Sequence, residues 1–104
     1  MHSKTTYNLK AIISLLPTEL GERKKSVATG YRPSFSFNSQ NHYSGEISFV
    51  DILELNPGDS AMATIKLLPA RTIRKNLKPK DAFTISEGNK TIGSGIIEDV
   101  NIVT

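Results

Sequence analysis

The sequence predicts an all-β fold, a small antiparallel closed β-barrel built from five or six short strands. In several short runs, apolar and polar residues alternate with a period of two, as in strands with one buried face. Turns that contain glycine or proline separate these runs. Gly93 and Gly95 stand two positions apart in an apolar strand pattern, which is typical of the close backbone approach at a barrel corner.

Length and composition indicate one globular domain. The 104 residues suit a single domain over 1–104, with a folded core over about 7–101. Hydrophobic residues make up 38% and charged residues 22%, and no apolar run approaches the roughly 20 residues of a membrane-spanning helix. The N-terminus lacks the features of a signal peptide and the chain has no cysteine, so we expect a reducing cytoplasm. The net charge of +3 permits contact with nucleic acid without requiring it.

The first predicted strand is the apolar run 9–16, "LKAIISLL", which Pro17 ends. A polar segment, "TELGERKKS", follows and has the composition of a loop. The next strand begins within "GYRPSFSFN", residues 30–38. Gly30 allows a sharp turn, and Pro33 is tolerated because it stands at the beginning of a strand.

Alternation continues through the rest of the chain. In the second strand Phe35 and Phe37 face one side, and serines face the other. Ile47 and Phe49 mark the next strand, which follows Gly45. The turn "NPGD" then precedes an alternating run over 61–67 that Pro69 ends.

The closing element is a predicted hairpin. Strands over 82–86 and 91–100 flank "EGNK", a connection that contains glycine. Residues 71–76 are the best helical alternative, but prolines bracket them, so they allow one turn at most.

No motif in the sequence indicates catalysis. A P-loop is absent, because the nearest glycine cluster, "IGSGII", lacks the lysine that follows the last glycine in that motif. No G-x-S-x-G elbow occurs. His2 stands at the terminus and His42 in a polar loop, where an exposed loop histidine is the simpler interpretation than a site.

The carboxylates also form no recognisable site. They are scattered singly or stand at turn positions, and the adjacent Glu98 and Asp99 would point to opposite faces of a strand. Two such carboxylates do not easily chelate one ion. We therefore expect no metal, no cofactor and no enzymatic activity.

The segment "RTIRKNLKPK" is the most basic part of the sequence. Its cations are Arg71, Arg74, Lys75, Lys78 and Lys80, with no acid before Asp81. Together with the cations of residues 23–25 they could form a patch that neutralises phosphates. The aromatic residues that would stack on unpaired bases are missing there, and a solvated polar loop is the alternative interpretation.

From about residue 9 to residue 100 the chain resembles the C-terminal barrel, the third domain, of elongation factor Tu. The landmarks follow the order of that family: "ELGERKKSV", "GYRPSFSF", Gly45 opening the next strand, the turn "PGD" and the strand ending "LLP". The last landmark, "FTISEGNKTIGSGII", resembles the closing hairpin of the family with its E-G-x-x-T-x-G-x-G pattern. Each motif alone is weak, but several in the same order are specific.

The resemblance implies a six-stranded antiparallel closed barrel, in agreement with the strand pattern. It places Phe35 and Phe37 in the interior and Tyr31 and Arg32 at the rim. There the two rim residues either fix the loop by packing and hydrogen bonds or contact a ligand. The GTPase domain of the factor has no counterpart in this chain.

The resemblance also implies candidate binding residues. In the family this barrel meets the T-stem backbone of transfer RNA, and other surfaces meet the GTPase domain and the exchange factor. Glu87 matches a family glutamate, and Ser44 stands where the family has a hydroxyl residue. Ser34 replaces a longer amide side chain, and Lys90 keeps a basic character. The basic segment over 71–80 is longer and more basic than the bacterial pattern of the family.

Two non-catalytic functions follow from these observations. The first is a translation-related module that binds transfer RNA or another structured RNA. Its candidate residues are Arg32, Ser34, Ser44, Glu87, Lys90, Arg71, Arg74, Lys75 and Lys78. The second is a protein-interaction module that docks a GTPase or an exchange-factor-like protein and has lost RNA binding. Neither function involves a membrane or a small-molecule substrate.

Overall fold

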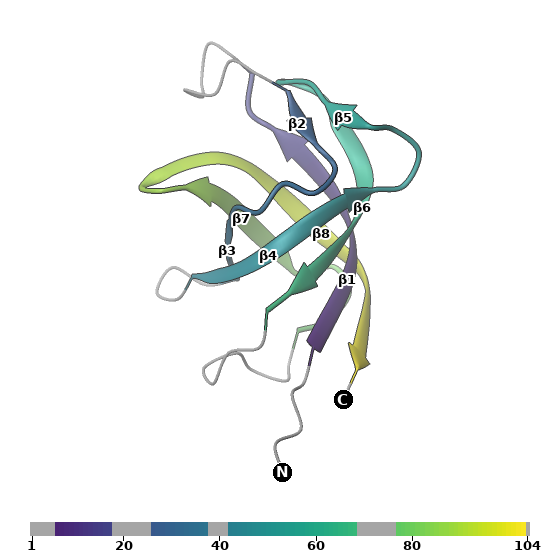
Figure 1. Cartoon of the computed structure of the whole chain (residues 1–104). Helices are drawn as coiled ribbons and strands as arrows, with labels where there is room; N and C mark the ends of the chain where they lie inside the picture. Colours follow the sequence, from purple (N-terminus) through teal and green to yellow (C-terminus); the bar gives the residue numbers. More distant parts are fainter. Residues whose placement is uncertain (1–5, 18–25, 38–41, 69–76, 104) are drawn as a thin grey trace.

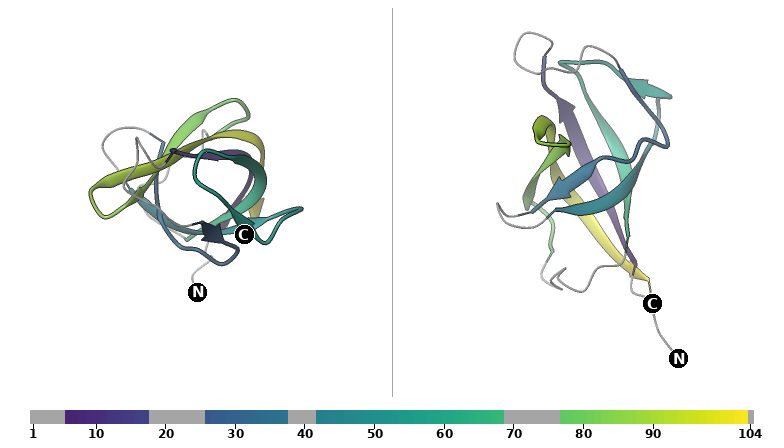
Figure 2. Two further views of the ribbon diagram at one scale, coloured as in Figure 1. Left: turned by 90° about the horizontal axis from the view of Figure 1, so that it is seen from above. Right: turned by 60° about the vertical axis from the view of Figure 1, so that its left-hand side comes forward.

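A computed structural model of the chain describes residues 6–17, 26–37, 42–68 and 77–103. These residues form a closed antiparallel barrel with the strand order β1-β6-β4-β3-β7-β8 (Figure 1), and Figure 2 shows the strands curving into a ring when seen from above. The barrel strands are β1 (Thr6–Leu15), β3 (Ser34–Ser36), β4 (Tyr43–Phe49), β6 (Ser60–Leu67), β7 (Ala82–Glu87) and β8 (Lys90–Val103). The predicted six-stranded barrel is therefore confirmed.

The barrel interior is filled by the apolar residues that the alternation predicts. Its largest fully buried side chains are Leu9, Ile13, Phe35, Ile47, Ile65, Leu67, Ile85 and Ile97. The rings of Phe35 and Phe83 meet edge to face, with their centroids 6.0 Å apart. Phe37 lies just beyond the end of β3 and is half-buried, and its ring centre is 5.4 Å from that of Phe83.

Gly93 and Gly95 have the role that their spacing predicts. A Cβ atom on Gly93 would stand 2.6 Å from the backbone oxygen of Ser14 on β1. A Cβ atom on Gly95 would stand 2.2 Å from the ring of Phe83. Because neither distance is compatible with a side chain, both positions need glycine for β8 to pack against its neighbours.

Gly45 differs from the prediction that it opens a strand. It lies inside β4, which begins two residues earlier at Tyr43. A Cβ atom here would stand 2.9 Å from the ring of Phe35 and 3.0 Å from the backbone oxygen of Lys66. The glycine therefore makes room for an interior ring rather than starting the strand.

The predicted turns are present. In the turn over 56–59, Gly58 has a φ of 86° and the amide of Asp59 donates to the carbonyl of Asn56 at 3.1 Å. In the hairpin between β7 and β8, Glu87 pairs with Lys90 around a two-residue connection. Gly88, the first residue of that connection, has a φ of 58°, an angle that glycine adopts without strain.

One end of the barrel carries a small second sheet that the sequence pattern did not predict. It pairs β2 (Val27–Ala28) with β5 (Glu54–Leu55). Val27 and Leu55 are both buried and belong to the same apolar cluster as the barrel interior. The two strands are only two residues long, so their alternation is too short to be read from sequence.

Strand β8 contains two irregularities. Its pairing with β1 passes from Ile97 to Asp99 and skips Glu98, and its pairing with β7 skips Ile92. Such β-bulges shift the register by one residue. Glu98 and Asp99 are consequently both exposed, so the expectation that they face opposite sides of a regular strand is wrong.

Three predictions concern residues outside the described ranges. These are the loop over 18–25, the single helical turn over 71–76, and the placement of Arg71, Arg74 and Lys75.

The close approach at Gly95 gives a first prediction. Gly95→Ala pushes a methyl group into the ring of Phe83 and should destabilise the barrel by roughly 1–3 kcal/mol, the usual cost of overpacking. Chemical denaturation measures the change in the free energy of unfolding. The matched control is Ser94→Ala at the exposed neighbouring position, which should change stability by less than about 0.5 kcal/mol. Equal stability of the two variants would contradict the packing described here.

Candidate functional site

The segment before β3 is bound to β4 by backbone hydrogen bonds. The amide of Gly30 donates to the carbonyl of Ile47 at 2.8 Å, and the amide of Ile47 donates to the carbonyl of Tyr31 at 2.9 Å. Continued by one residue, this antiparallel register places Arg32 opposite Glu46. Their side chains form an ion pair of 3.8 Å between Nη2 and Oε1. The Arg32 side chain is nevertheless 75% exposed, so most of the guanidinium faces solvent.

Tyr31 connects this segment to the hairpin on the other side of β3. Its hydroxyl donates a hydrogen bond to Oε2 of Glu87, the last residue of β7, in a partly buried position. A charge-assisted hydrogen bond of this kind is stronger than a neutral one. Tyr31 therefore fixes the loop, as one of the two predicted roles requires, and Glu87 has a structural partner.

Ser34 and Ser44 lie side by side on the outer face of the barrel. They are directly opposite each other in the pairing of β3 with β4, and their neighbours Phe35 and Tyr43 point inward. Lys66 on β6 lies opposite Glu46, in the outward-facing row next to that of Ser34 and Ser44. These strands surround a cleft of about 140 Å³, which we call the rim notch. It is lined by Arg32, Ser44, Gly45, Glu46, Lys66 and Leu68.

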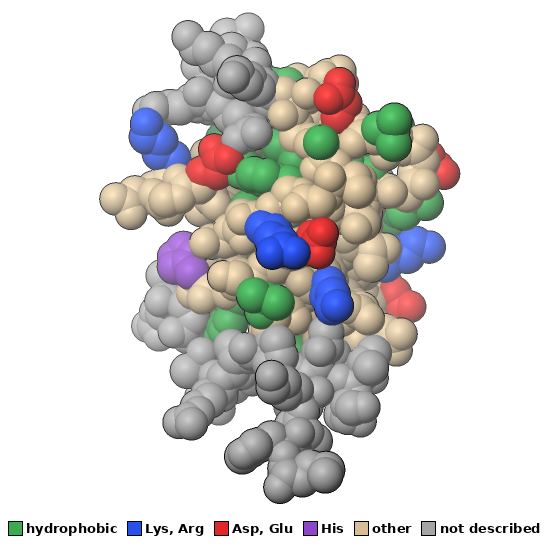
Figure 3. Space-filling model, viewed as in Figure 1, with side chains coloured by type: hydrophobic (Ala, Val, Ile, Leu, Met, Phe, Trp, Pro, Cys, Tyr) green, Lys and Arg blue, Asp and Glu red, His purple; other side chains and the backbone are tan. Residues whose placement is uncertain are grey.

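The rim notch contains two cations and one acid. Figure 3 shows basic and acidic side chains side by side on this face of the molecule. The pattern in the sequence placed Lys66 on an outer strand position but gave no reason to associate it with Arg32. That association requires the register of β4 against β6, which the sequence does not show.

The structure separates Lys78 from the other described candidates. The amide of Lys78 donates to Oδ2 of Asp81 at 3.2 Å, just before the first residue of β7. Glu87 ends β7 and pairs with Lys90 of β8, so both lie at the other end of β7, roughly 17 Å from its first residue, Ala82, at the rise of an extended strand.

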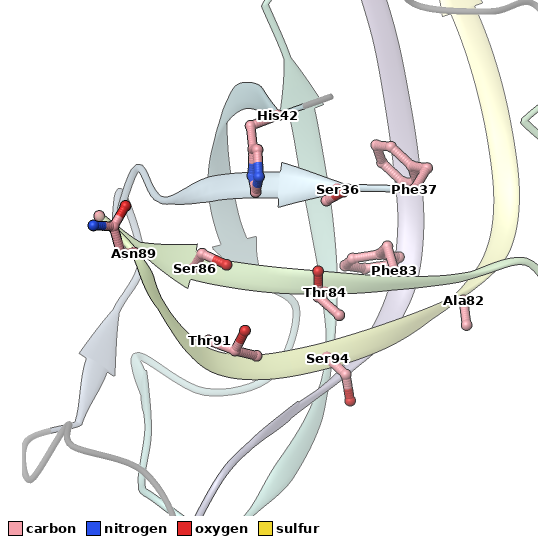
Figure 4. Close-up of a pocket in the computed structure, with 11 residues that line it drawn as sticks. Ser36, Phe37, His42, Ala82, Phe83, Thr84, Ser86, Asn89, Thr91 and Ser94 are labelled. Carbon is pink, nitrogen blue, oxygen red and sulfur yellow. The ribbon is translucent and has the colours of Figure 1, made fainter. Parts of the chain in front are cut away.

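A second, larger depression lies on the outer face of β3, β7 and β8. It has a volume of about 590 Å³, and we call it the hydroxyl groove (Figure 4). The lining residues are Ser36, Phe37, His42, Ala82, Phe83, Thr84, Ser86, Gly88, Asn89, Thr91 and Ser94. None of these residues is an aspartate, glutamate, lysine or arginine.

The hydroxyl groups of this groove belong to two rows that cross the strands. The first hydroxyl row runs over β6, β1, β8, β7 and β3 through Ser60, Ser14, Ser94, Thr84 and Ser36. The second hydroxyl row runs over β8, β7, β3 and β4 through Thr91, Ser86, Ser34 and Ser44. Because Ser34 pairs with both Ser86 and Ser44, the second row connects the groove to the rim notch.

Burial divides the groove into a floor and walls. Ser36 and Ser86 are each only 6% exposed, and Phe83 is only 3% exposed. Thr84, Ser94 and most of the remaining lining residues are exposed. His42, which the sequence suggested as a simple exposed loop histidine, is exposed and lines the edge of the groove.

Comparison with known families agrees with the barrel and its landmarks. The family model for the elongation factor Tu C-terminal domain matches residues 2–101. The chain belongs to this family. As a member of the elongation factor Tu C-terminal domain family it is a translation-factor-like module, and the domain of that family is a non-catalytic barrel.

The described residues also bear on other kinds of site. Those residues include no helix that is long and apolar enough to cross a membrane. In the same part of the chain, no three histidine, cysteine, aspartate or glutamate side chains come together as candidate metal ligands.

The two side-chain pairs around Tyr31 and Arg32 give a second prediction. A double-mutant cycle with Tyr31→Phe and Glu87→Ala should give a coupling energy of about 1–2 kcal/mol, because the hydrogen bond is partly buried and has a charged acceptor. The cycle with Arg32→Ala and Glu46→Ala should give less than about 0.5 kcal/mol, because solvent screens an exposed ion pair. Urea denaturation of the single and double variants measures both energies. A larger coupling for Arg32 and Glu46 would contradict this order.

Proposed function

We propose that this barrel is a non-catalytic, translation-associated module that binds structured RNA, with transfer RNA as the first candidate. The observation that carries the proposal is the grouping of Arg32, Ser34, Ser44 and Lys66 on one outer face of a barrel of this family. Arg32 and Lys66 supply charge for phosphate oxygens, and the serines supply short-range hydrogen bonds to the backbone. The translation association also implies the cytoplasm.

The charges of the rim notch fit a weak, salt-sensitive contact. The described lining residues include two cations and one carboxylate and so carry a single net positive charge. A phosphate would compete with Glu46 for the exposed guanidinium of Arg32. We propose that the basic segment over 71–80 adds phosphate contacts through Arg71, Arg74, Lys75 and Lys78, and that Lys90 does so from the hairpin.

Salt dependence tests this proposal. An electrophoretic shift with bulk transfer RNA should be visible at low salt and weaken steeply as salt rises, because each phosphate contact releases counterions. Arg32→Ala and Lys66→Ala should each weaken binding roughly three- to tenfold and reduce the slope of log affinity against log salt by about 1. Arg74→Ala with Lys75→Ala should act in the same direction.

The control for this experiment is Lys10→Ala, which removes an exposed lysine of β1 that does not line the notch. It should leave the slope unchanged. If transfer RNA and other structured RNA fail to bind even at the lowest salt, the RNA-binding proposal is wrong.

A second candidate function is the docking of a protein, such as a GTPase or an exchange-factor-like partner. One observation favours it, an apolar row on the outer face that runs through Met62, Ile12, Ile96 and Ala82. Ile12 is 40% exposed and Ile96 49% exposed. Contiguous exposed apolar side chains mark many protein-interaction sites.

The apolar row gives a prediction that separates the two functions. If the barrel docks a protein through this row, Ile12→Ser with Ile96→Ser should abolish capture of that protein and leave RNA binding unchanged. Because apolar contacts are little screened, the capture should survive moderate salt, unlike RNA binding. Affinity capture from native lysate with the wild-type and variant chains measures this. Equal capture by both chains would exclude the row as the docking surface.

A further inference from the structure

We propose that the hydroxyl groove contacts the riboses of the bound RNA and thereby distinguishes RNA from DNA, an inference that rests on the RNA-binding function proposed above. The groove and the rim notch differ in chemistry although the second hydroxyl row joins them. The notch contains cations, whereas the groove lining contains hydroxyl, amide, imidazole and apolar groups. The two surfaces are therefore suited to different parts of the same polymer.

The composition of the groove matches a ribose better than a phosphate. Phosphate affinity depends on lysine and arginine, and neither type is among the described residues that line the groove. A serine or threonine hydroxyl both donates and accepts a hydrogen bond, and the 2′-hydroxyl of RNA does the same. The described lining residues also include no carboxylate, and a carboxylate would repel the phosphates that flank each ribose.

The spacing of the rows suits a polymer that crosses the strands. Adjacent members of a row are separated by about 4.8 Å, the distance between neighbouring strands. The two rows are roughly 7 Å apart, because Thr84 and Ser86 are two positions apart on β7. Figure 4 shows that the lining residues follow β7 and β8 from Ala82 to the tip of the hairpin at Asn89. This length accommodates several hydrogen bonds to one nucleic-acid strand.

Cations lie at both ends of the groove, outside its lining. Lys90 follows Asn89 directly at the hairpin end. At the other end Lys80 stands two residues before Ala82, and its amide donates to the carbonyl of Ile97 at 2.7 Å. A strand lying in the groove would thus have its riboses over the uncharged centre and its phosphates near these lysines.

A protein partner fits the groove less well. Serine and alanine are depleted in protein interfaces, whereas tryptophan, tyrosine, phenylalanine, methionine and arginine are enriched. The described lining of the groove has three serines, two threonines and one alanine. Of the enriched types it has only Phe37 and Phe83, and Phe83 is only 3% exposed. The ring of Phe37 is half-buried and is held against Phe83 and Tyr43.

The test compares three hairpins of identical sequence made of RNA, of 2′-O-methyl RNA and of DNA. The 2′-O-methyl hairpin loses the 2′-hydroxyl donor, so it separates hydrogen bonding from the other differences between RNA and DNA. Fluorescence anisotropy at low salt measures the affinity of the full chain for each. We expect the wild-type chain to bind RNA at least several-fold more tightly than the other two.

The variants Thr84→Val and Ser94→Ala remove hydroxyl groups from exposed positions and keep similar shapes. Each should weaken RNA binding by roughly two- to tenfold, as expected for one neutral hydrogen bond, and leave DNA binding and the salt slope unchanged. The matched control is Ser48→Ala on β4, an exposed outward hydroxyl that lines neither surface. Thermal denaturation verifies that all three variants remain folded.

The outcomes separate this inference from the function on which it rests. Equal affinity for RNA and DNA, or an RNA preference that Thr84→Val and Ser94→Ala leave intact, overturns the ribose contact but not RNA binding. If the chain binds neither the hairpins nor transfer RNA, the ribose contact and the RNA-binding function are both wrong. If the groove variants abolish capture of a protein partner and leave RNA affinity unchanged, the groove is a protein surface and the ribose contact is wrong.

Discussion

The close passage of β8 past β1 and Phe83 is the constraint on which the rest of the barrel depends. It requires two positions without side chains, Gly93 and Gly95, because a backbone oxygen and an aromatic ring occupy the space that a Cβ atom would need. The ring of Phe83 then contacts Phe35 inside the barrel and Phe37 at its edge. The closure of the barrel and the packing of its interior therefore depend on the same contacts. The spacing of the rows on the outer face depends in turn on that closure.

The outer surface of this closed sheet changes its chemistry from row to row. The apolar row through Ile12 and Ile96 lies directly beside the hydroxyl row through Ser14 and Ser94. The second hydroxyl row leads from the groove to the cations of the rim notch. One small barrel thus presents a charged, a hydroxyl and an apolar surface at fixed distances from one another.

Local patterns in the sequence were sufficient for the fold but not for the site. The alternation around Phe35, the turn at Gly58 and the two-residue spacing of the glycines in β8 are patterns between near neighbours in the chain, so a single sequence shows them. The pairing of Lys66 with Glu46 and the hydroxyl rows depend on strand register. The register of β8, on which the hydroxyl rows depend, is shifted by bulges at Ile92 and Glu98, which no local sequence pattern indicates.

Figure 1 shows that the chain enters and leaves the barrel at the same end, where Thr6 pairs with Val103. These two residues form the outermost rung of the antiparallel ladder between β1 and β8, and the hydrogen bonds of such a ladder are perpendicular to the strands. A mechanical force applied to both ends would therefore act on one pair of residues at a time and separate the two strands pair by pair, starting at Thr6 and Val103. Because the rungs cannot share the load, the barrel should resist pulling weakly even when it resists heat well.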